Sequence, residues 1–172
     1  MSTDSLCKSD PVGAIQSNLV ATASMVQIAN KFQAAKFVFV SSEWVYPELD
    51  RAEIQTEALK LSLTDLNSLY AMSKLMGENL VRVTSEVMHI ILRFGIVYGP
   101  RSNPGSAPES VLAKVNRGEK VSIGSLNTAR RFVYIDDLVD AISILVSDPG
   151  DHNGEIYNIS GPDLISLGEI AM

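Results

Sequence analysis

The chain has 172 residues, the size of one domain, and 46% of them are hydrophobic, which is enough for a substantial core. Acidic residues outnumber basic ones by 20 to 14, for a net charge of −6. This balance disfavours nucleic-acid binding, which needs many cations to neutralise phosphates. One or two arginines could still hold a small anionic ligand.

Cysteine and histidine are scarce. Cys7 is the only cysteine, so we expect no disulfide within the chain but a free thiol in a frayed terminus. The two histidines, His89 and His152, form no cluster that indicates a metal site. No apolar run approaches the ~18–20 residues that span a bilayer, and residues 1–10 lack the pattern of a secretory signal. We therefore expect a cytoplasmic protein that does not bind membranes.

The first predicted element is a long helix at residues 10–33. Asp10 suits the N-cap of a helix and Pro11 suits its first position. Apolar residues then recur at helical spacing up to about Gln33.

A buried strand follows at Phe37–Val40, an unbroken apolar run that is typical of a parallel sheet covered on both faces. It ends at Ser41 and Ser42. Ligands of open α/β sheets bind beyond the carboxyl ends of the strands, so these two hydroxyls are well placed to meet one. Residues 43–66 are expected to form a long irregular connection.

The remaining elements alternate between helix and strand, which predicts an α/β fold. They are a helix at 67–85, a strand at 89–94, a helix at 110–117, strands at 121–123 and 132–135, a helix capped by Asp136 or Asp137, and a strand at 156–159. Ser166 and Glu169 form a capping-box pattern that announces another helix. Because the chain stops at Met172, we expect this helix to be cut short and the sequence to be part of a longer one.

Tyr70 and Lys74 lie one helical turn apart, so their side chains can approach each other. A phenol has an unperturbed pKa near ~10. A nearby ammonium group favours the phenolate and is expected to lower the pKa of Tyr70, which would make it a general acid and base near neutral pH. Taken alone, the spacing also fits an ordinary surface tyrosine and lysine.

Five segments in order give the chain a resemblance to a known family. They are FVFVSSEWVYPE, YAMSKLMGENL, ILRFGIVYGPR, RRFVYIDDLVDAI and EIYNISGPDLISLGEIA. They are similar to the signatures of extended short-chain dehydrogenases of the NAD-dependent epimerase/dehydratase family, including UDP-glucose/galactose 4-epimerase-like proteins. The resemblance covers nearly everything from Asp10 onward.

The resemblance implies a catalytic triad of Ser42, Tyr70 and Lys74. Tyr70 would be the acid and base at the reacting hydroxyl or carbonyl group. Lys74 would bind the nicotinamide ribose and tune Tyr70. Ser42, four residues before Tyr46, matches the catalytic serine of the family in preference to Ser41, and its hydroxyl would bond the substrate oxygen.

Other matched positions imply ligand contacts. Ser17 and Asn18 fall where the family binds the cofactor, although they also suit the polar face of a helix. Arg130 matches the arginine that holds the phosphate of a nucleotide sugar. Glu43 and Trp44 follow the catalytic serine and are expected beside the substrate.

The implied fold is a partial Rossmann-like parallel sheet flanked by helices, with part of a small C-terminal substrate-binding region. Residues 1–100 would be the C-terminal part of the cofactor domain. Residues 101–172 would be the substrate-side region, mixed with returning Rossmann elements. The implied cofactor is NAD, with NADP not excluded, and the implied substrate is nucleotide-sugar-like. Helices 10–33 and 67–85 resemble the pair through which family members form homodimers.

The chain departs from the family pattern in several places. Up to Met76 the only glycine is Gly13, so the glycine loop that cradles the cofactor's pyrophosphate is absent. Pro47 replaces a usual glycine. Trp44 follows Glu43 where sugar 4,6-dehydratases have an Asp-Glu pair, and Ile96 replaces a common asparagine.

Two functions remain open at this point. The first is a 4-epimerase-like enzyme that transiently oxidises a sugar hydroxyl. The second is a non-catalytic fragment or interaction module derived from the same family, which the missing glycine loop favours. In either case we expect the 172 residues alone to be poorly stable, because sheet edges and apolar helix faces would be exposed.

Overall fold

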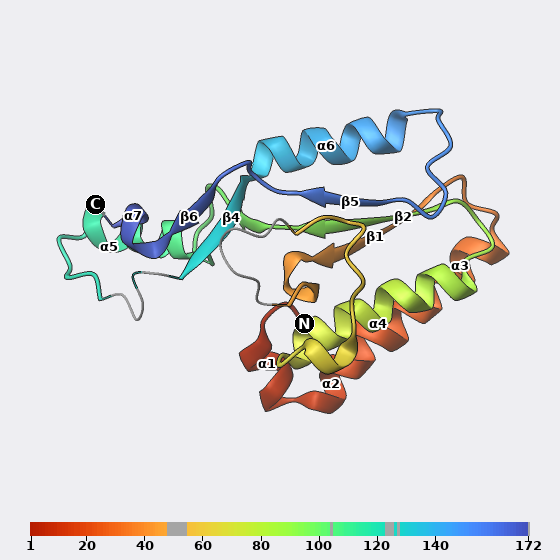
Figure 1. The fold of residues 1–172 in the computed structure, drawn as a ribbon, viewed down its shortest axis with the longest axis horizontal. Coiled ribbons are helices and arrows are strands. Elements are labelled where there is room, and N and C mark those ends of the chain that lie inside the picture. Colours follow the sequence, from red (N-terminus) through yellow and green to blue (C-terminus); the bar gives the residue numbers. More distant parts are fainter. Residues whose placement is uncertain (48–54, 104, 123–125, 127, 172) are drawn as a thin grey trace. The chain divides into compact units, whose positions relative to one another are not determined.

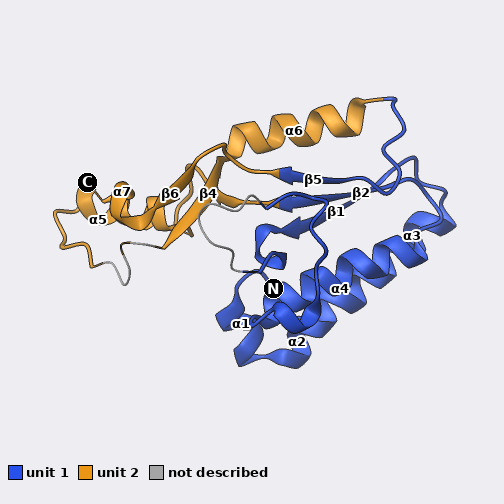
Figure 2. Cartoon of the chain, in the orientation of Figure 1, with its two compact units in different colours: residues 1–93, 149–158 blue, residues 94–148, 159–172 orange. Residues whose placement is uncertain are grey.

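The computed structural model describes residues 1–47, 55–103, 105–122, 126 and 128–171, and the chain divides into two compact units. Unit 1 comprises residues 1–93 and 149–158, and unit 2 comprises residues 94–148 and 159–172 (Figure 2). The predicted division of function at residues 100 and 101 stays a prediction.

Unit 1 contains the long helices α3 and α4 (Figure 1). In chain order they are α1 (Asp4–Ser9), α2 (Pro11–Ile15), the π-helical turn η1 (Gln16–Val20), α3 (Ala21–Lys31), β1 (Phe37–Ser42), the 3₁₀ turns η2 (Glu43–Val45) and η3 (Leu63–Asp65), α4 (Leu69–Thr84), β2 (His89–Phe94) and β5 (Ile156–Ile159).

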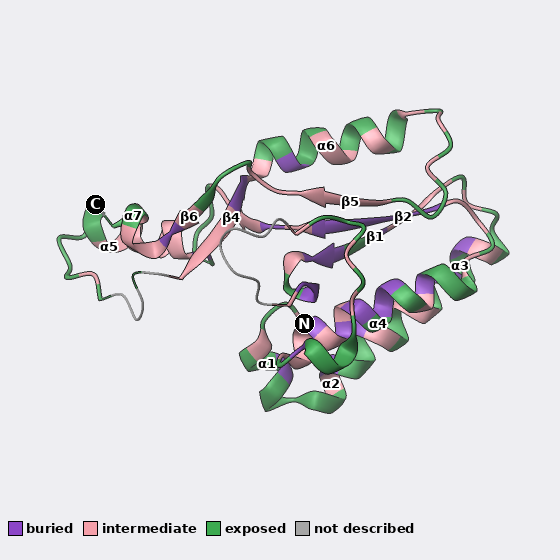
Figure 3. Cartoon of the chain, viewed as in Figure 1, coloured by how far each residue is buried: buried purple, intermediate pink, exposed green. Residues whose placement is uncertain are grey.

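The strands of unit 1 form a sheet in the order β1-β2-β5. All three run in the same direction (Figure 1), so the predicted parallel sheet is confirmed. β2 is the most deeply buried strand: Ile90, Ile91 and Leu92 are fully inaccessible to solvent (Figure 3). The prediction of a strand buried on both faces is thus confirmed for β2. It is wrong for β1, where Phe37 and Val38 are half-buried and Val40 is exposed, because β1 lies at an edge of this sheet.

Helix α4 packs against β1 and against the helix that α2, η1 and α3 form together. Gly77 allows this close approach, because a Cβ atom there would lie 2.6 Å from Cζ of Phe39. Phe39 joins Val26, Val81 and Ile91 in one hydrophobic cluster. A second cluster, which begins just after β1 in the sequence, consists of Val45, Tyr46, Leu66, Ala71 and Leu75.

Unit 2 contains β3 (Ile96–Tyr98), α5 (Ala107–Asn116), β4 (Ala129–Tyr134), α6 (Ile135–Ser147), β6 (Leu164–Ser166) and α7 (Leu167–Ile170). Its sheet has the order β3-β4-β6. β3 pairs with β4 in parallel, with Ile96 opposite Phe132, and β4 pairs with β6 antiparallel, with Ala129 opposite Ser166. Capping boxes begin two of its helices, Ser106 with Glu109 and Ser166 with Glu169.

Most predicted elements are confirmed, with shifted ends. Asp10 caps α2, where the first predicted helix begins, by accepting a hydrogen bond from Gly13 N. Asp136 and Asp137 are not caps: they lie in the first turn of α6, and Tyr134 is the capping residue. Residues 121 and 122 are not in a strand, and residue 123 lies outside the described residues. The strands β3 and β6 were not expected; each has only three residues, too few to show a pattern.

The expected frayed terminus around Cys7 is also wrong. Cys7 lies in α1 and is fully buried, since α1 packs against α2 and α4. Within the part of the chain described, no helix has both the length and the apolar character needed to cross a membrane.

Candidate active site

Ser42 ends β1 at the edge where the sheet was expected to meet a ligand. Its side chain is buried, with 8% of the residue exposed. Its backbone is extended, and its hydroxyl accepts a hydrogen bond from Trp44 N at 3.3 Å, which starts the turn η2. The chain therefore turns sharply just after the serine, which fixes the direction of its side chain.

Tyr70 is in the first turn of α4, which Ser68 caps by accepting a hydrogen bond from Ala71 N. Burial raises the pKa of Tyr70, while hydrogen bonding with the Ser42 side chain acts in the opposite direction and lowers it. Burial is the larger effect. The ring of Trp44 meets the ring of Tyr70 edge to face, with 6.1 Å between centroids. The structure thus brings Ser42, Trp44 and Tyr70 together.

Lys74 reaches the same strand end from the next turn of α4. Its Nζ donates to Val40 O at 3.0 Å and lies 5.9 Å from the centroid of the Tyr70 ring. Burial lowers the pKa of Lys74. The Lys74 ammonium group lies over the ring of Tyr70, but burial of the phenol has the largest effect on the pKa of Tyr70 and raises it. The predicted lowering of the Tyr70 pKa is therefore wrong in this structure.

Ser17 and Asn18 lie in the π-helical turn η1. Asn18 is buried, and its Nδ2 donates to Ser73 Oγ at 2.9 Å. Ser73 Oγ in turn donates to Tyr70 O at 2.8 Å. The amino group of Met1 donates to Ser17 Oγ at 3.1 Å and to Asn18 Oδ1 at 2.7 Å. Asn18 is thereby connected to the helix that carries Tyr70.

Cys7 and Glu43 complete the surroundings. The Cys7 thiol is near enough to act on the pKa of both Tyr70 and Lys74. Glu43 is half-buried at the start of η2. Among the residues that the structure describes, no group of three or more His, Cys, Asp or Glu side chains could hold a metal ion.

A network of buried polar groups next to Ser42 was not predicted. Glu78 pairs with Arg93 through two hydrogen bonds of 3.0 and 2.7 Å, and both side chains are almost fully buried. Ser41 Oγ donates to Glu78 Oε1 at 2.5 Å. The position of Glu78, one turn beyond Lys74 on the same face of the helix, was the signal that could have indicated it.

Arg130 belongs to unit 2. It lies in β4, where its Nη1 donates to Ala129 O at 2.8 Å. Because it belongs to the other unit, the structure does not place it relative to Ser42, Tyr70 and Lys74. Its predicted contact with a phosphate stays a prediction.

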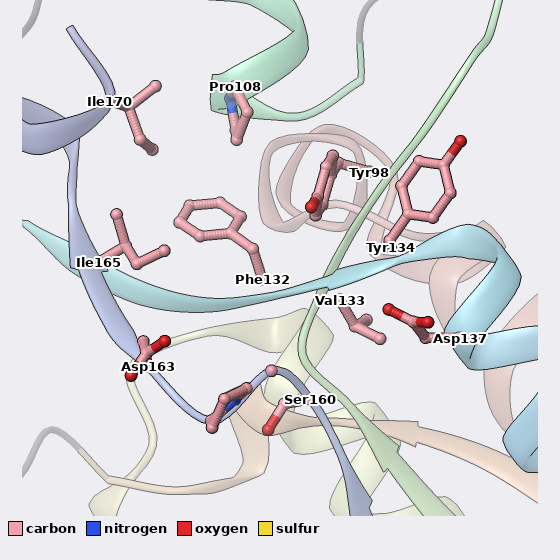
Figure 4. A pocket seen from close by; sticks show the side chains of 12 residues that line it. Tyr98, Pro108, Phe132, Val133, Tyr134, Asp137, Ser160, Asp163, Ile165 and Ile170 are labelled. Carbon is pink, nitrogen blue, oxygen red and sulfur yellow. The ribbon is translucent and has the colours of Figure 1, made fainter. Parts of the chain in front are cut away.

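Unit 2 has a cavity of about 500 Å³ that the sequence analysis missed (Figure 4). Tyr98 packs against Phe132 and Tyr134 from β4, with ring centroids 6.5 and 5.4 Å away. Figure 4 shows Pro108, Ile165 and Ile170 closing one side of it. The alternation of Phe132 and Tyr134 along β4 could have indicated an aromatic face. Arg130 does not line this cavity.

Several known proteins are similar to this chain. It is 30% identical over 154 residues to YtcB of Bacillus subtilis (strain 168), described as an uncharacterized UDP-glucose epimerase; the match covers 87% of this chain and 47% of that protein. It is 28% identical over 158 residues to Protein CapI of Staphylococcus aureus, covering 90% and 46% of the two chains. The chain therefore spans about half the length of the curated relatives it matches.

Solved structures agree. The UDP-glucuronic acid 4-epimerase of Bacillus cereus, in complex with UDP-glucuronic acid and NAD, matches with a TM-score of 0.80 and 27% identity over 89% of this chain and 48% of that one. The UDP-glucose 4-epimerase of Thermus thermophilus, in complex with NAD, matches the fold with a TM-score of 0.84 at 22% identity, covering 100% and 57%. The family model "NAD dependent epimerase/dehydratase family" matches residues 1–160. The chain is thus a member of the NAD-dependent epimerase/dehydratase family, within the extended short-chain dehydrogenases.

Proposed function

We propose that this chain carries the catalytic side of an NAD-dependent enzyme that inverts a sugar carbon of a nucleotide sugar, in the manner of a 4-epimerase. The observation that supports this most directly is the convergence of Ser42, Tyr70 and Lys74 at the end of β1. Family membership and NAD-bound structural neighbours support the cofactor.

The groups present fit such a cofactor. Lys74 has three N–H donors, of which Val40 O accepts one, and Asn18 Nδ2 has two, of which Ser73 Oγ accepts one. Ser17 Oγ donates to Gly13 O and accepts from the Met1 amino group, so NAD would have to replace one of these contacts to bind it. These are donors and acceptors that suit ribose hydroxyls and a carboxamide. When bound, NAD would supply the acceptor for a hydride from the sugar carbon.

Proton transfer would fall to Tyr70. Its phenolate would take the proton of the sugar hydroxyl during oxidation, and the phenol formed in this way would return a proton to the sugar oxygen during reduction. Ser42 would donate a hydrogen bond to the same sugar oxygen as charge develops on it. Glu43 and Trp44, which follow Ser42, would contact the sugar, and Arg130 would pair with the diphosphate.

Isothermal titration calorimetry with NAD tests the proposal. The purified chain should bind NAD, and Lys74→Ala should weaken binding at least tenfold. Lys60→Ala, which removes an exposed lysine of the same unit, should leave the dissociation constant unchanged. Absence of binding by a chain with a native circular dichroism spectrum would contradict the proposal. That result would favour the alternative, a non-catalytic interaction module derived from the same family.

A further inference from the structure

The two serines at the end of β1 have different partners. The Ser42 side chain is hydrogen-bonded to the Tyr70 side chain, whereas Ser41 Oγ donates to Glu78 Oε1 at 2.5 Å. One peptide unit joins the two serines, so a displacement of Ser41 also displaces Ser42, and the partners of both lie on α4. Ser41 is 2% exposed and Glu78 is 3% exposed, so this contact is shielded from water.

Arg93 keeps Glu78 in place and extends the network past Ser42. Its guanidinium group binds both carboxylate oxygens of Glu78 and also donates to the Tyr46 hydroxyl at 2.9 Å. Burial works against the charge on Arg93, but the bonds and charge of Glu78 outweigh it, so the pKa of Arg93 is raised. The guanidinium also lies 4.9 Å from the centroid of the Tyr46 ring. The Tyr46 hydroxyl donates onward to Asn158 Oδ1 at 2.8 Å.

Residues 41–46 are thus held at both ends. Glu78 binds the first residue of this segment, and Arg93 binds the last. Ser42 lies between the two contacts. We call Ser41, Tyr46, Glu78 and Arg93 the Glu78 clamp.

We infer that Glu78 is a positioning residue for the Ser42–Tyr70 pair: through the Glu78 clamp it fixes the segment 41–46 and so holds the Ser42 hydroxyl against Tyr70. Glu78 itself binds Ser41 and Arg93, and its effect on the site passes through Ser41. This inference deepens the proposed function and rests on it for its catalytic meaning. That the Glu78 clamp fixes the segment 41–46 is a statement about this chain without a cofactor or substrate.

The test reads the ionisation of Tyr70 directly. The chain is labelled with ring-fluorinated tyrosine, which lowers the pKa of each phenol into a range where folding is retained. The titration is followed by ¹⁹F NMR, and Tyr70→Phe assigns the signal. Ser42→Ala should raise the pKa of Tyr70 by roughly 0.5 to 1, as expected for the loss of one hydrogen bond that favours the phenolate.

Ser41→Ala is the decisive variant, because it releases the strand from Glu78 and leaves the Glu78–Arg93 pair whole. It should raise the pKa of Tyr70 by at least half of the Ser42→Ala effect. Ser41→Thr, which keeps the hydroxyl, should restore the wild-type value. Glu78→Gln should act like Ser41→Ala, and if it fails to fold, the serine variants still carry the test.

The matched control is Ser166→Ala, which also removes a buried serine bonded to a glutamate, Glu169, but in unit 2. It should leave the titration of Tyr70 unchanged. The inference is overturned if Ser41→Ala leaves the Tyr70 titration unchanged, if Ser42→Ala has no effect, or if Ser166→Ala shifts it equally. NAD calorimetry on the same samples separates the two proposals, because failure to bind NAD counts against the proposed function while the Tyr70 titration still judges the clamp.

Discussion

The surroundings of Tyr70 shift its pKa in two opposite directions. Burial raises its pKa, hydrogen bonding with Ser42 lowers it, and the Cys7 thiol acts with burial. At neutral pH the side chain is therefore a phenol, ready to donate a proton. Abstraction of a proton requires the phenolate, whose population grows as the pH rises towards the pKa.

We accordingly expect the rate of sugar oxidation by the NAD-bound chain to increase with pH and to level off only above the pKa of Tyr70. Tyr70→Phe should abolish this rise and lower the rate at least 100-fold, by roughly the factor that a general acid or base contributes. Steady-state rates across pH 6 to 10, with Tyr98→Phe as a control from unit 2, measure this. A flat profile for the wild-type chain would rule out Tyr70 as the base.

Gly77 is a second residue whose effect can be stated in advance. Alanine there gains about 1 kcal/mol of helix propensity, but its Cβ would lie 2.6 Å from Phe39 Cζ, and relieving such overpacking costs about 1–3 kcal/mol. Gly77→Ala should therefore lower the free energy of unfolding by about 1 kcal/mol, measured by urea denaturation. Gly13 and Gly154 offer no matched control, because a Cβ at Gly13 would meet the Asp10 carboxylate and the φ of Gly154 is positive. An unchanged or higher free energy of unfolding for Gly77→Ala would contradict this prediction.

The sequence allowed Ser42, Tyr70 and Lys74 to be named together, and the structure brings all three to one place. The sequence did not allow the direction of the shift in the Tyr70 pKa to be predicted. Helical spacing gives which side chains are neighbours, but the balance between burial and hydrogen bonding depends on side chains from α1, η2 and β1. Glu78 and Arg93 escaped notice for the same reason: their contacts join residues 15 positions apart on different elements.

At the scale of elements, one carboxylate organises the connection between β3 and α5. Burial works to raise the pKa of Glu109, but hydrogen bonds from the N–H groups of Gly105, Gly99 and Ser106, with Arg101 beside them, lower it to about 2. The folded pKa lies below the usual 4.5. The stabilisation is therefore complete above about pH 4.5 and is lost as the pH falls towards 2.

Glu109→Gln should loosen this connection, because an amide has one acceptor oxygen and no charge. We expect faster hydrogen exchange at neutral pH for the amides of Gly99, Gly105 and Ser106, and a smaller loss of stability between pH 4.5 and 2 than in the wild-type chain. Exchange measured by NMR checks both. Asp140→Asn, which alters an exposed carboxylate on α6 of the same unit, should change neither.

The boundaries of elements show where sequence patterns stop being sufficient. Both long helices of unit 1 were predicted, since caps and apolar periodicity mark them clearly. The helix α5 begins three residues before its predicted start, because the capping box of Ser106 and Glu109 lies upstream of the apolar residues. The short strands β3 and β6 depend on pairing with β4, a contact across the chain that no local pattern reveals.

At the scale of the whole molecule, exposed apolar side chains follow the long helices of unit 1. On the helix formed by α2, η1 and α3, and at its C-terminal end, these side chains are Val12, Ile15, Val20, Met25, Ile28 and Phe32. On α4 they are Met76 and Val83. Large exposed apolar patches mark association sites. Because this helix pair resembles the one through which family members form homodimers, we propose a second copy of this chain as the partner.

Ile28→Glu should shift the chain towards a monomer by placing a charge in the apolar interface. Sedimentation velocity at several concentrations measures the weight-average mass. Val139→Glu, at a comparably exposed apolar position on α6, is the matched control and should not change it. A wild-type chain that sediments as a monomer and melts cooperatively would contradict both the dimer and the expected poor stability.

The π-helical turn at Gln16–Val20 makes the number of residues in this helix matter as much as their identity. Ala21 N bonds Gln16 O, five residues back, so the turn accommodates one residue more than an α-helix would. Because the wide turn absorbs this extra residue, deleting one residue would close it to a regular α-helical turn and leave the flanking segments in register. The change would fall on the turn itself, where Asn18 Nδ2 donates to Ser73 Oγ. The helix as a whole should therefore tolerate a one-residue deletion here, whereas the contact that connects Asn18 to the helix of Tyr70 should not survive it.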